Sequence, residues 1–99
     1  MRIERIAELD LTPEDDARIA GLLARCFTTD FGGRSYFIQR HHLRFVMRDP
    51  GVVGHMGLTY RVVRLGQALV PVLGLADVAT DPQRRGEGIA ARMLEEVIA

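Results

Sequence analysis

Hydrophobic positions in the C-terminal third of the chain follow two different patterns. Residues 70–80 form an almost continuous apolar run in which Asp77 is the only charged residue, and this predicts a mostly buried strand. Further on, apolar residues recur three and four positions apart, with charged residues on the other side. These apolar positions are Ile89, Met93, Leu94, Val97 and Ile98. The sequence therefore predicts a strand and an amphipathic helix joined by a polar turn.

The N-terminal half predicts one strand and two helices. Residues 1–9 alternate in part between apolar and polar positions, which indicates an opening strand. Thr12 is suited to cap a helix that has Pro13 at its first position, and an apolar stripe continues this helix to about Thr28. After a loop with a glycine pair, residues 35–42 predict a second, short helix.

Two tight turns organise the middle of the chain. Residues 43–48 and 52–65 predict strands separated by an Asp-Pro-Gly turn, and a Gly-Gln turn leads from the second strand into the strand at 68–80. Short turns of this kind connect antiparallel neighbours. The expected fold class is therefore α+β, with a mixed, mostly antiparallel sheet flanked by helices.

Length and charge limit the classes of protein that this chain can form. The 99 residues, 47% of them hydrophobic, predict a single domain over residues 1–99. Thirteen basic and thirteen acidic residues cancel, so we expect neither a nucleic acid nor a membrane as partner. A single cysteine, Cys26, excludes an internal disulfide and suits a reducing compartment. We expect a cytoplasmic protein in which Cys26 is a small buried hydrophobe.

The polar turn before the last helix has the features of an anion site. The first amides of a helix have no acceptor within the helix, and the helix dipole favours negative charge there. Gly86 and Gly88 lack side chains, so an anion can approach the backbone, while Arg84 and Arg85 add positive charge at the rim. These features predict a site for the diphosphate of a phosphorylated cofactor.

The same turn resembles the signature of a known family. The segment Arg85-Gly86-Glu87-Gly88-Ile89-Ala90 is similar to the Arg/Gln-x-x-Gly-x-Gly/Ala signature of the GNAT superfamily of N-acetyltransferases. The order of predicted elements also matches the first two thirds of that family's three-layer fold. The resemblance implies direct transfer of an acetyl group from acetyl-CoA, as co-substrate, to a primary amine of an unidentified small-molecule or peptide acceptor.

The resemblance also implies a partial domain. The family continues beyond the signature helix with another strand, another helix and a hairpin, whereas this sequence ends within the apolar stripe of that helix. We therefore expect truncation after the signature helix, with the C-terminal strands missing from this chain. A missing segment, or strands from another copy in a homodimer or swapped oligomer, would complete the site.

The resemblance assigns roles to particular residues. The backbone of Val78 and Thr80 is expected to pair with the pantetheine arm of acetyl-CoA, and the Val78 amide is expected to stabilise the oxyanion. Backbone amides of the signature are expected to hold the pyrophosphate; these residues are Arg85, Gly86, Glu87, Gly88, Ile89 and Ala90. No metal site is expected.

The identity of the general base is left open by the sequence. Asp77 is the carboxylate nearest to the expected thioester, and burial could suit it to accept a proton from the amine. The alternative is a strand-end polar group bonded to neighbouring backbone. His55 has the same two interpretations, as a base in the cleft or as a buried histidine with satisfied hydrogen bonds.

Other polar and aromatic residues admit structural interpretations. The adjacent pair His41 and His42 has no third ligand at metal spacing. Tyr36 and Phe37 fall where the family forms its acceptor pocket, but core packing explains them as well. Arginines at positions 40, 44 and 48 are expected along a solvated strand edge.

Two functions from different classes fit these observations. The first is an acyl-CoA-dependent N-acetyltransferase. The second is a non-catalytic CoA-binding or interaction module, left by loss of the C-terminal half. A dinucleotide-binding unit is disfavoured, because it requires alternating strands and helices around a parallel sheet.

Overall fold

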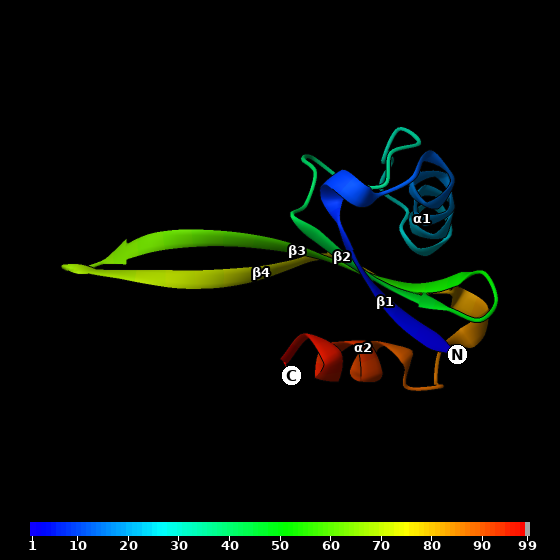
Figure 1. Ribbon diagram of the computed structural model, residues 1–99. Helices are drawn as coiled ribbons and strands as arrows, with labels where there is room; N and C mark the ends of the chain where they lie inside the picture. The colour runs from blue at the N-terminus through cyan, green and yellow to red at the C-terminus, as the bar shows by residue number, and fades with distance from the viewer. Residues whose placement is uncertain (99) are drawn as a thin grey trace.

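The computed structural model describes residues 1–98, in which four strands form one antiparallel sheet. The strands lie side by side in chain order (Figure 1). This arrangement confirms the predicted strands, the first helix and the last helix. The elements are β1 (Arg2–Ala7), α1 (Pro13–Cys26), β2 (Leu43–Arg48), β3 (Val52–Leu65), β4 (Ala68–Thr80) and α2 (Ile89–Ile98), with 3₁₀ helices at Glu8–Asp10 and Pro82–Arg84.

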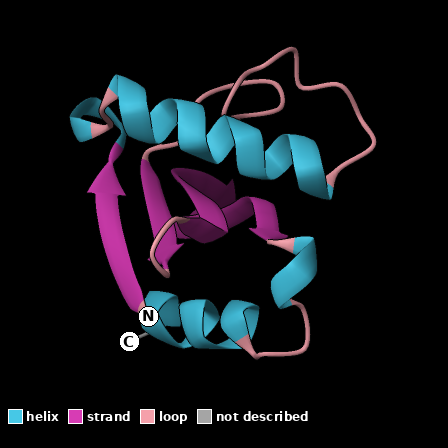
Figure 2. Cartoon of the chain, turned by 90° about the vertical axis from the view of Figure 1, so that its right-hand side faces the viewer, coloured by secondary structure: helices cyan, strands magenta, loops and turns pink. Residues whose placement is uncertain are grey.

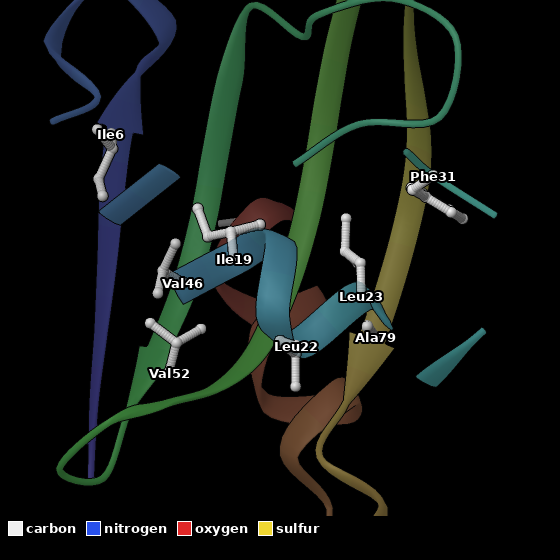
Figure 3. Close-up of a cluster of buried hydrophobic side chains, with 8 residues drawn as sticks. All are labelled: Ile6, Ile19, Leu22, Leu23, Phe31, Val46, Val52 and Ala79. Carbon is white, nitrogen blue, oxygen red and sulfur yellow. The ribbon is translucent and has the colours of Figure 1, made fainter. Parts of the chain in front are cut away.

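The two α-helices cover opposite faces of the sheet, which gives three layers (Figure 2). Between α1 and the sheet lies a buried cluster to which α1 itself contributes. Its members are Ile6, Ile19, Leu22, Leu23, Phe31, Val46, Val52 and Ala79 (Figure 3). On the other face lie Phe45, Met47, Val53, Met56, Leu58, Ile89 and Met93. Because the central strands are buried on both faces, apolar residues follow one another there without strict alternation, interrupted by the buried Arg44 and His55. Within residues 1–98, neither helix has the length and apolar character needed to cross a membrane.

The outer halves of β3 and β4 form a hairpin arm that extends beyond both helices (Figure 1). From the pair Tyr60 and Leu73 outward, the strands stay in register to the turn at Gly66 and Gln67. Several of its apolar side chains are exposed to solvent, namely Tyr60, Val62, Leu65, Leu69, Val72 and Leu73. Within β3 and β4, the helices therefore pack only against the inner halves.

The first helix begins as its sequence predicts. The Thr12 hydroxyl accepts a hydrogen bond from the Asp15 amide at 3.1 Å, and Pro13 occupies the first turn. This cap satisfies one amide that has no partner within the helix. The helix ends at Cys26, close to the predicted end.

The predicted helix at residues 35–42 is wrong, because this segment is an irregular loop. In a helix, each backbone carbonyl would accept a hydrogen bond from the amide four residues later. Here two carbonyls of the loop accept hydrogen bonds from arginine side chains instead. The Ser35 carbonyl accepts from Arg44 at 2.6 Å, and the Phe37 carbonyl accepts from Arg34 at 2.7 Å. The loop is therefore held by arginine side chains three and nine positions away, which apolar periodicity does not reveal.

The prediction that the arginines at positions 40, 44 and 48 lie along a solvated strand edge is also wrong for two of the three. The β2 strand lies between β1 and β3, so it has no free edge. The side chain of Arg44 is fully buried and donates two hydrogen bonds of 2.8 Å to the Glu8 carboxylate. Arg48 donates two bonds to Asp15, at 2.9 and 3.0 Å. Of the three, only Arg40 lies at the surface, where it binds Glu8.

The charge of Arg44 stabilises the fold only through its partners. Burial alone would raise the pKa of Glu8, but hydrogen bonds from Arg44 and Arg40 outweigh this effect and lower it. Losing one member of such a pair leaves the other charge poorly compensated. The pair therefore attaches the 3₁₀ turn after β1 to the centre of the sheet.

We predict that Arg44→Gln lowers the free energy of unfolding by about 3 kcal/mol, because it leaves Glu8 without its main partner. The matched variant Arg64→Gln, at an exposed position of the hairpin arm, should change it by less than about 0.5 kcal/mol. Urea denaturation followed by circular dichroism measures both values. Equal stability of the two variants would show that the buried pair is not needed.

Candidate functional site

The β3–β4 ladder is interrupted by a bulge at the position of the predicted catalytic residues. His55 lies opposite Ala79 and Gly57 lies opposite Ala76, so Met56 faces two residues of β4, Asp77 and Val78. Asp77 has a φ of 53°, which is unusual for a residue other than glycine. A bulge of this kind removes one residue from the ladder and bends the strand. Asp77 and Val78 therefore lie where β4 changes direction.

Beneath the bulge lies His55, whose side chain is fully buried. Its Nδ1 lies 2.8 Å from the Asp77 carbonyl oxygen, and its Nε2 lies 3.3 Å from Arg44 Nη1. A guanidinium can only donate, so Nε2 must accept and Nδ1 must carry the proton that binds Asp77. Burial lowers the pKa of His55 to about 4, with a further contribution from the charge of Arg44. His55 is therefore a neutral, buried support for the bulge, and its interpretation as a base in the cleft is wrong.

The Asp77 side chain joins the bulge to the loop before β2. Its Oδ2 lies 2.9 Å from His41 Nε2 and accepts a hydrogen bond of 3.3 Å from the Phe37 amide. The His41 ring rests on Gly57, where an added Cβ would lie 2.5 Å from ring atoms. The Asp77 carboxylate is thus bonded to the Phe37 amide and to a histidine, which lie 40 and 36 positions away in the sequence.

A continuous groove leads from the bulge to the start of α2. Its first part, of about 340 Å³, is lined by Cys26, Phe27, Val78, Ala79, Thr80, Arg85 and Ala90. Its second part, of about 320 Å³, is lined by Thr80, Arg84, Arg85, Gly86, Gly88, Ile89, Ala90 and Ala91. The two parts adjoin, because Thr80, Arg85 and Ala90 line both of them. The groove contains all the residues predicted to bind a cofactor except Glu87.

A smaller depression lies on the other side of the bulge. It has a volume of about 190 Å³ and is lined by Phe37, Ile38, Gln39, His41, Thr59, Ala76 and Asp77. Asp77 and Val78 are adjacent in the chain and line the depression and the groove respectively. The bulge therefore separates two concave surfaces, one leading to the glycine turn and one formed by the loop before β2.

The glycine turn has the backbone geometry that its sequence predicts. Gly86 and Gly88 have φ values of 88° and 76°, which most other residues avoid, and added Cβ atoms would meet no neighbour within 4 Å. The Arg92 amide donates to the Gly88 carbonyl at 3.0 Å. The helix thus begins after Gly88, and amides of its first turn have no partner within the helix.

The two arginines of the turn have different roles, which corrects the expectation that both supply charge to the rim. Arg84 Nη2 donates to Asp49 at 2.7 Å, and Arg84 Nε donates to Glu87 at 2.9 Å. These bonds raise the pKa of Arg84 and attach the turn to the β2–β3 connection. Arg85 forms no ion pair within residues 1–98 and lines the groove. Of the two arginines, Arg85 is therefore the one whose charge has no acidic partner in the described part of the chain.

The single cysteine packs beside this groove. The Cys26 thiol donates to the Thr80 carbonyl at 3.2 Å, and its side chain packs against the cluster between α1 and the sheet. Burial raises the pKa of Cys26, although nearby Arg85 partly offsets this effect. A thiol in this state is a poor nucleophile, so the packing interpretation holds.

A larger open depression, of about 680 Å³, lies away from the bulge. It is formed by Arg18, Gly21 and Arg25 of α1, by Pro50 and Gly51 of the β2–β3 connection, by Val52 and Val53 at the start of β3, and by Asp81. Asp81 pairs with Arg25 at 3.3 Å and also accepts from the Gln83 amide, so its carboxylate is already bonded. We place the candidate site at the bulge and the turn that follows it, where helix amides and an interrupted strand edge meet Arg85, which has no ion pair within residues 1–98.

Comparison with known proteins identifies the family. Residues 10–99 match the family model described as an acetyltransferase (GNAT) domain, so the chain belongs to the GNAT acetyltransferases. No curated protein matches the sequence.

Solved structures share this fold. A probable N-acyltransferase from Enterococcus faecalis V583 superposes with a TM-score of 0.75 at 18% identity, over 98% of this chain and 25% of that one. A GNAT family acetyltransferase from Brucella melitensis, solved in complex with acetyl-CoA, gives 0.63 at 22% identity, over 98% of this chain and 66% of that one. An aminoglycoside 6'-N-acetyltransferase from Acinetobacter haemolyticus superposes with a TM-score of 0.64 at 14% identity, over 99% of this chain and 69% of that one. The chain spans between a quarter and about two thirds of these proteins.

The sequence did not indicate that His41 helps to hold the bulge. His41 was considered only as half of a metal-binding pair, yet its ring contacts Asp77. Among the described residues, no cluster of potential metal ligands is found. The one local signal was Asp77 itself, a lone acid in an apolar strand, which requires a partner when it is partly buried.

We predict that His55 makes stability depend on pH. The pKa of His55 in the folded state lies below the ordinary value of 6.5. Its full contribution to the free energy of unfolding is therefore present above pH 6.5. The contribution is lost as the pH falls toward 4, because the unfolded chain then binds more protons, and the loss from this group is about 3 kcal/mol. Urea denaturation at several pH values measures the effect.

The variant His55→Asn tests this assignment, because an Asn amide can still donate to the Asp77 carbonyl but does not titrate. Between pH 6.5 and pH 4 its stability should decline less steeply than that of the wild type. Arg64→Gln, at an exposed position of the hairpin arm, serves as control and should keep the wild-type pH dependence. A decline in His55→Asn as steep as in the wild type would contradict the assignment.

Proposed function

We propose that this protein transfers an acetyl group from acetyl-CoA to a primary amine by direct attack. The observation that carries the proposal is the continuous groove from the glycine turn to the bulge in β4. Membership of the GNAT acetyltransferases supports the general reaction, and a protein with the same fold was solved with acetyl-CoA.

The glycine turn would bind the pyrophosphate of the co-substrate. Arg85 supplies a charge that no acidic side chain within residues 1–98 neutralises, and Gly86 and Gly88 leave the backbone accessible. The Glu87 side chain is held by Arg84, so the role proposed for Glu87 is that of its backbone amide. Amides of the first turn of α2 add donors where the helix dipole favours an anion.

The edge of β4 would hold the pantetheine arm. This strand is the last of the described sheet, so the backbone of Val78 and Thr80 has no strand on its outer side within residues 1–98. An extended ligand can pair with such an edge as an added strand. The bulge re-aims the backbone at Val78, whose amide would stabilise the oxyanion formed at the thioester carbon.

Asp77 would act as the general base. The acceptor ammonium gives one proton to the Asp77 carboxylate, and the free amine then attacks the thioester carbon. The new carbon–nitrogen bond forms as the carbon–sulfur bond breaks. The second proton leaves the nitrogen for the departing thiolate, so the products are an amide and free CoA, while the first proton passes from Asp77 to solvent. The depression lined by Phe37 and Thr59 would receive the acceptor.

A second candidate function is a non-catalytic CoA-binding module. One oxygen of Asp77 already accepts hydrogen bonds from His41 and Phe37, which favours a structural role for this carboxylate. Calorimetric titration with acetyl-CoA, together with a thiol-release assay on a panel of small amines, separates the two functions. Binding without thiol release would support the module.

We predict that Arg85→Glu weakens acetyl-CoA binding at least about tenfold, because it replaces a charge-assisted hydrogen bond to phosphate by repulsion. The matched control Arg64→Glu makes the same charge change on the hairpin arm and should leave affinity unchanged. Isothermal titration calorimetry measures both. An unaltered affinity for Arg85→Glu would remove the pyrophosphate assignment.

We predict that Asp77→Asn lowers kcat at least about a hundredfold, because an amide cannot accept the proton of the ammonium. Its KM for acetyl-CoA should stay near the wild-type value, since Asn tolerates a positive φ and preserves the bulge. The exposed Asp10→Asn is the control. Steady-state thiol release provides both parameters, and a wild-type kcat in Asp77→Asn would exclude Asp77 as the base.

A further inference from the structure

The proposed reaction leaves one buried group unexplained. Nδ1 of His41 is the one buried side-chain polar atom that lacks a hydrogen-bond partner within residues 1–98. Leaving such an atom unpaired costs free energy, so its presence calls for a reason. The reason lies at the other ring nitrogen, because Nε2 is 2.9 Å from Asp77 Oδ2.

The contact with Asp77 determines the protonation of the His41 ring. An ionised carboxylate can only accept hydrogen bonds, so Nε2 must carry the proton. In the neutral ring, Nδ1 is then a bare acceptor in a place without a donor. His55 adopts the opposite arrangement, with its proton on Nδ1. The two histidines thus hold Asp77 at different atoms, His55 at the carbonyl and His41 at the carboxylate.

The two oxygens of the Asp77 carboxylate are used differently. Oδ2 accepts from both His41 and the Phe37 amide, whereas Oδ1 has no side-chain or loop partner within residues 1–98. The His41 ring is fixed in turn, since it is nearly buried and rests on Gly57, where no Cβ would fit. The carboxylate therefore cannot rotate without losing both bonds.

We infer that His41 is a positioning residue, which holds Oδ2 of Asp77 so that Oδ1 accepts the proton of the acceptor amine. This inference rests on the proposed acetyl transfer. In the step itself, one ammonium proton moves to Oδ1 and the amine keeps its electron pair for attack. Oδ2 then becomes the carbonyl oxygen of the acid and still accepts from His41, so the hydrogen bond persists throughout. The His41 ring exchanges no proton with the substrate.

Two substitutions at His41 test this role. His41→Leu removes the donor and should lower kcat about tenfold or more, with KM for acetyl-CoA unchanged, because a misplaced base loses rate rather than affinity. His41→Gln can place an amide donor near Asp77 Oδ2 and should recover most of the lost kcat. The neighbouring His42→Leu, which does not contact Asp77, should match the wild type. Equal kcat in His41→Leu and the wild type, or no recovery in a folded His41→Gln, would overturn the inference.

A third variant leaves the histidine in place. Gly57→Ala adds a Cβ where the ring lies, so it should displace His41 and lower kcat as His41→Leu does. Thermal unfolding checks that each variant is folded. If a folded Gly57→Ala retains the wild-type kcat, the placement of the ring does not matter and the inference fails.

A measurement on the wild type covers the case in which variants do not fold. Nitrogen-15 spectra of the imidazole rings at neutral pH should show His41 protonated at Nε2 and His55 protonated at Nδ1. A His41 ring protonated at Nδ1 would overturn the inference.

Failure of the inference can be told apart from failure of the proposed function. If the wild type does not bind acetyl-CoA, the proposed function fails. If it binds but releases no thiol with any amine, the transfer and the role of His41 both fail, and the binding module stands. If the wild type turns over and His41→Leu does so equally well, only the inference fails.

Discussion

The arrangement of the site depends on the bulge in the β3–β4 ladder, where Asp77 and Val78 of β4 lie opposite Met56 of β3. Without the bulge, β4 would run straight along β3 and would not bend at Asp77 and Val78. The bulge gives β4 a bend, places the two residues toward different concave surfaces and leaves Asp77 with a positive φ. Such a conformation persists only when surrounding contacts determine it. Here His55 and His41 supply those contacts from β3 and from the loop before β2.

Fold stability and site geometry are coupled through a buried chain of polar contacts. The chain runs from Glu8 to Arg44, from Arg44 to His55 and from His55 to the Asp77 carbonyl, so it crosses the sheet from the end of β1 to β4. Each buried charge or ring nitrogen in it has a partner, as groups in a low-dielectric interior require. Loss of a member therefore affects the bulge as well as the core. The glycine turn is attached separately, through the contacts of Arg84 with Asp49 and Glu87.

Local patterns in the sequence were sufficient for the regular elements and for the glycine turn. The helical spacing after Ile89, the cap at Thr12 and the positions of tight turns each depend on a few neighbouring residues, and all are confirmed. The loop at 35–42 was predicted as a helix because its apolar spacing suits one, whereas Arg44 and Asp16 bind its polar groups from outside. The only local signal of the bulge is the lone acid Asp77 in an apolar strand, because the partners of Asp77 lie 22 and 36 positions away. Sequence thus located the groove but not the contacts that shape it.

We propose that acetyl-CoA binds along the edge of β4, from the bulge to the glycine turn. The most direct test is titration of the nitrogen-15-labelled protein with CoA, in which the chemical shifts of the backbone amides are followed. We expect saturable shifts concentrated at Val78, Thr80, Gly86 and Gly88. Shifts confined to the depression beside Arg18 and Arg25, or no saturable shifts at millimolar CoA, would contradict it.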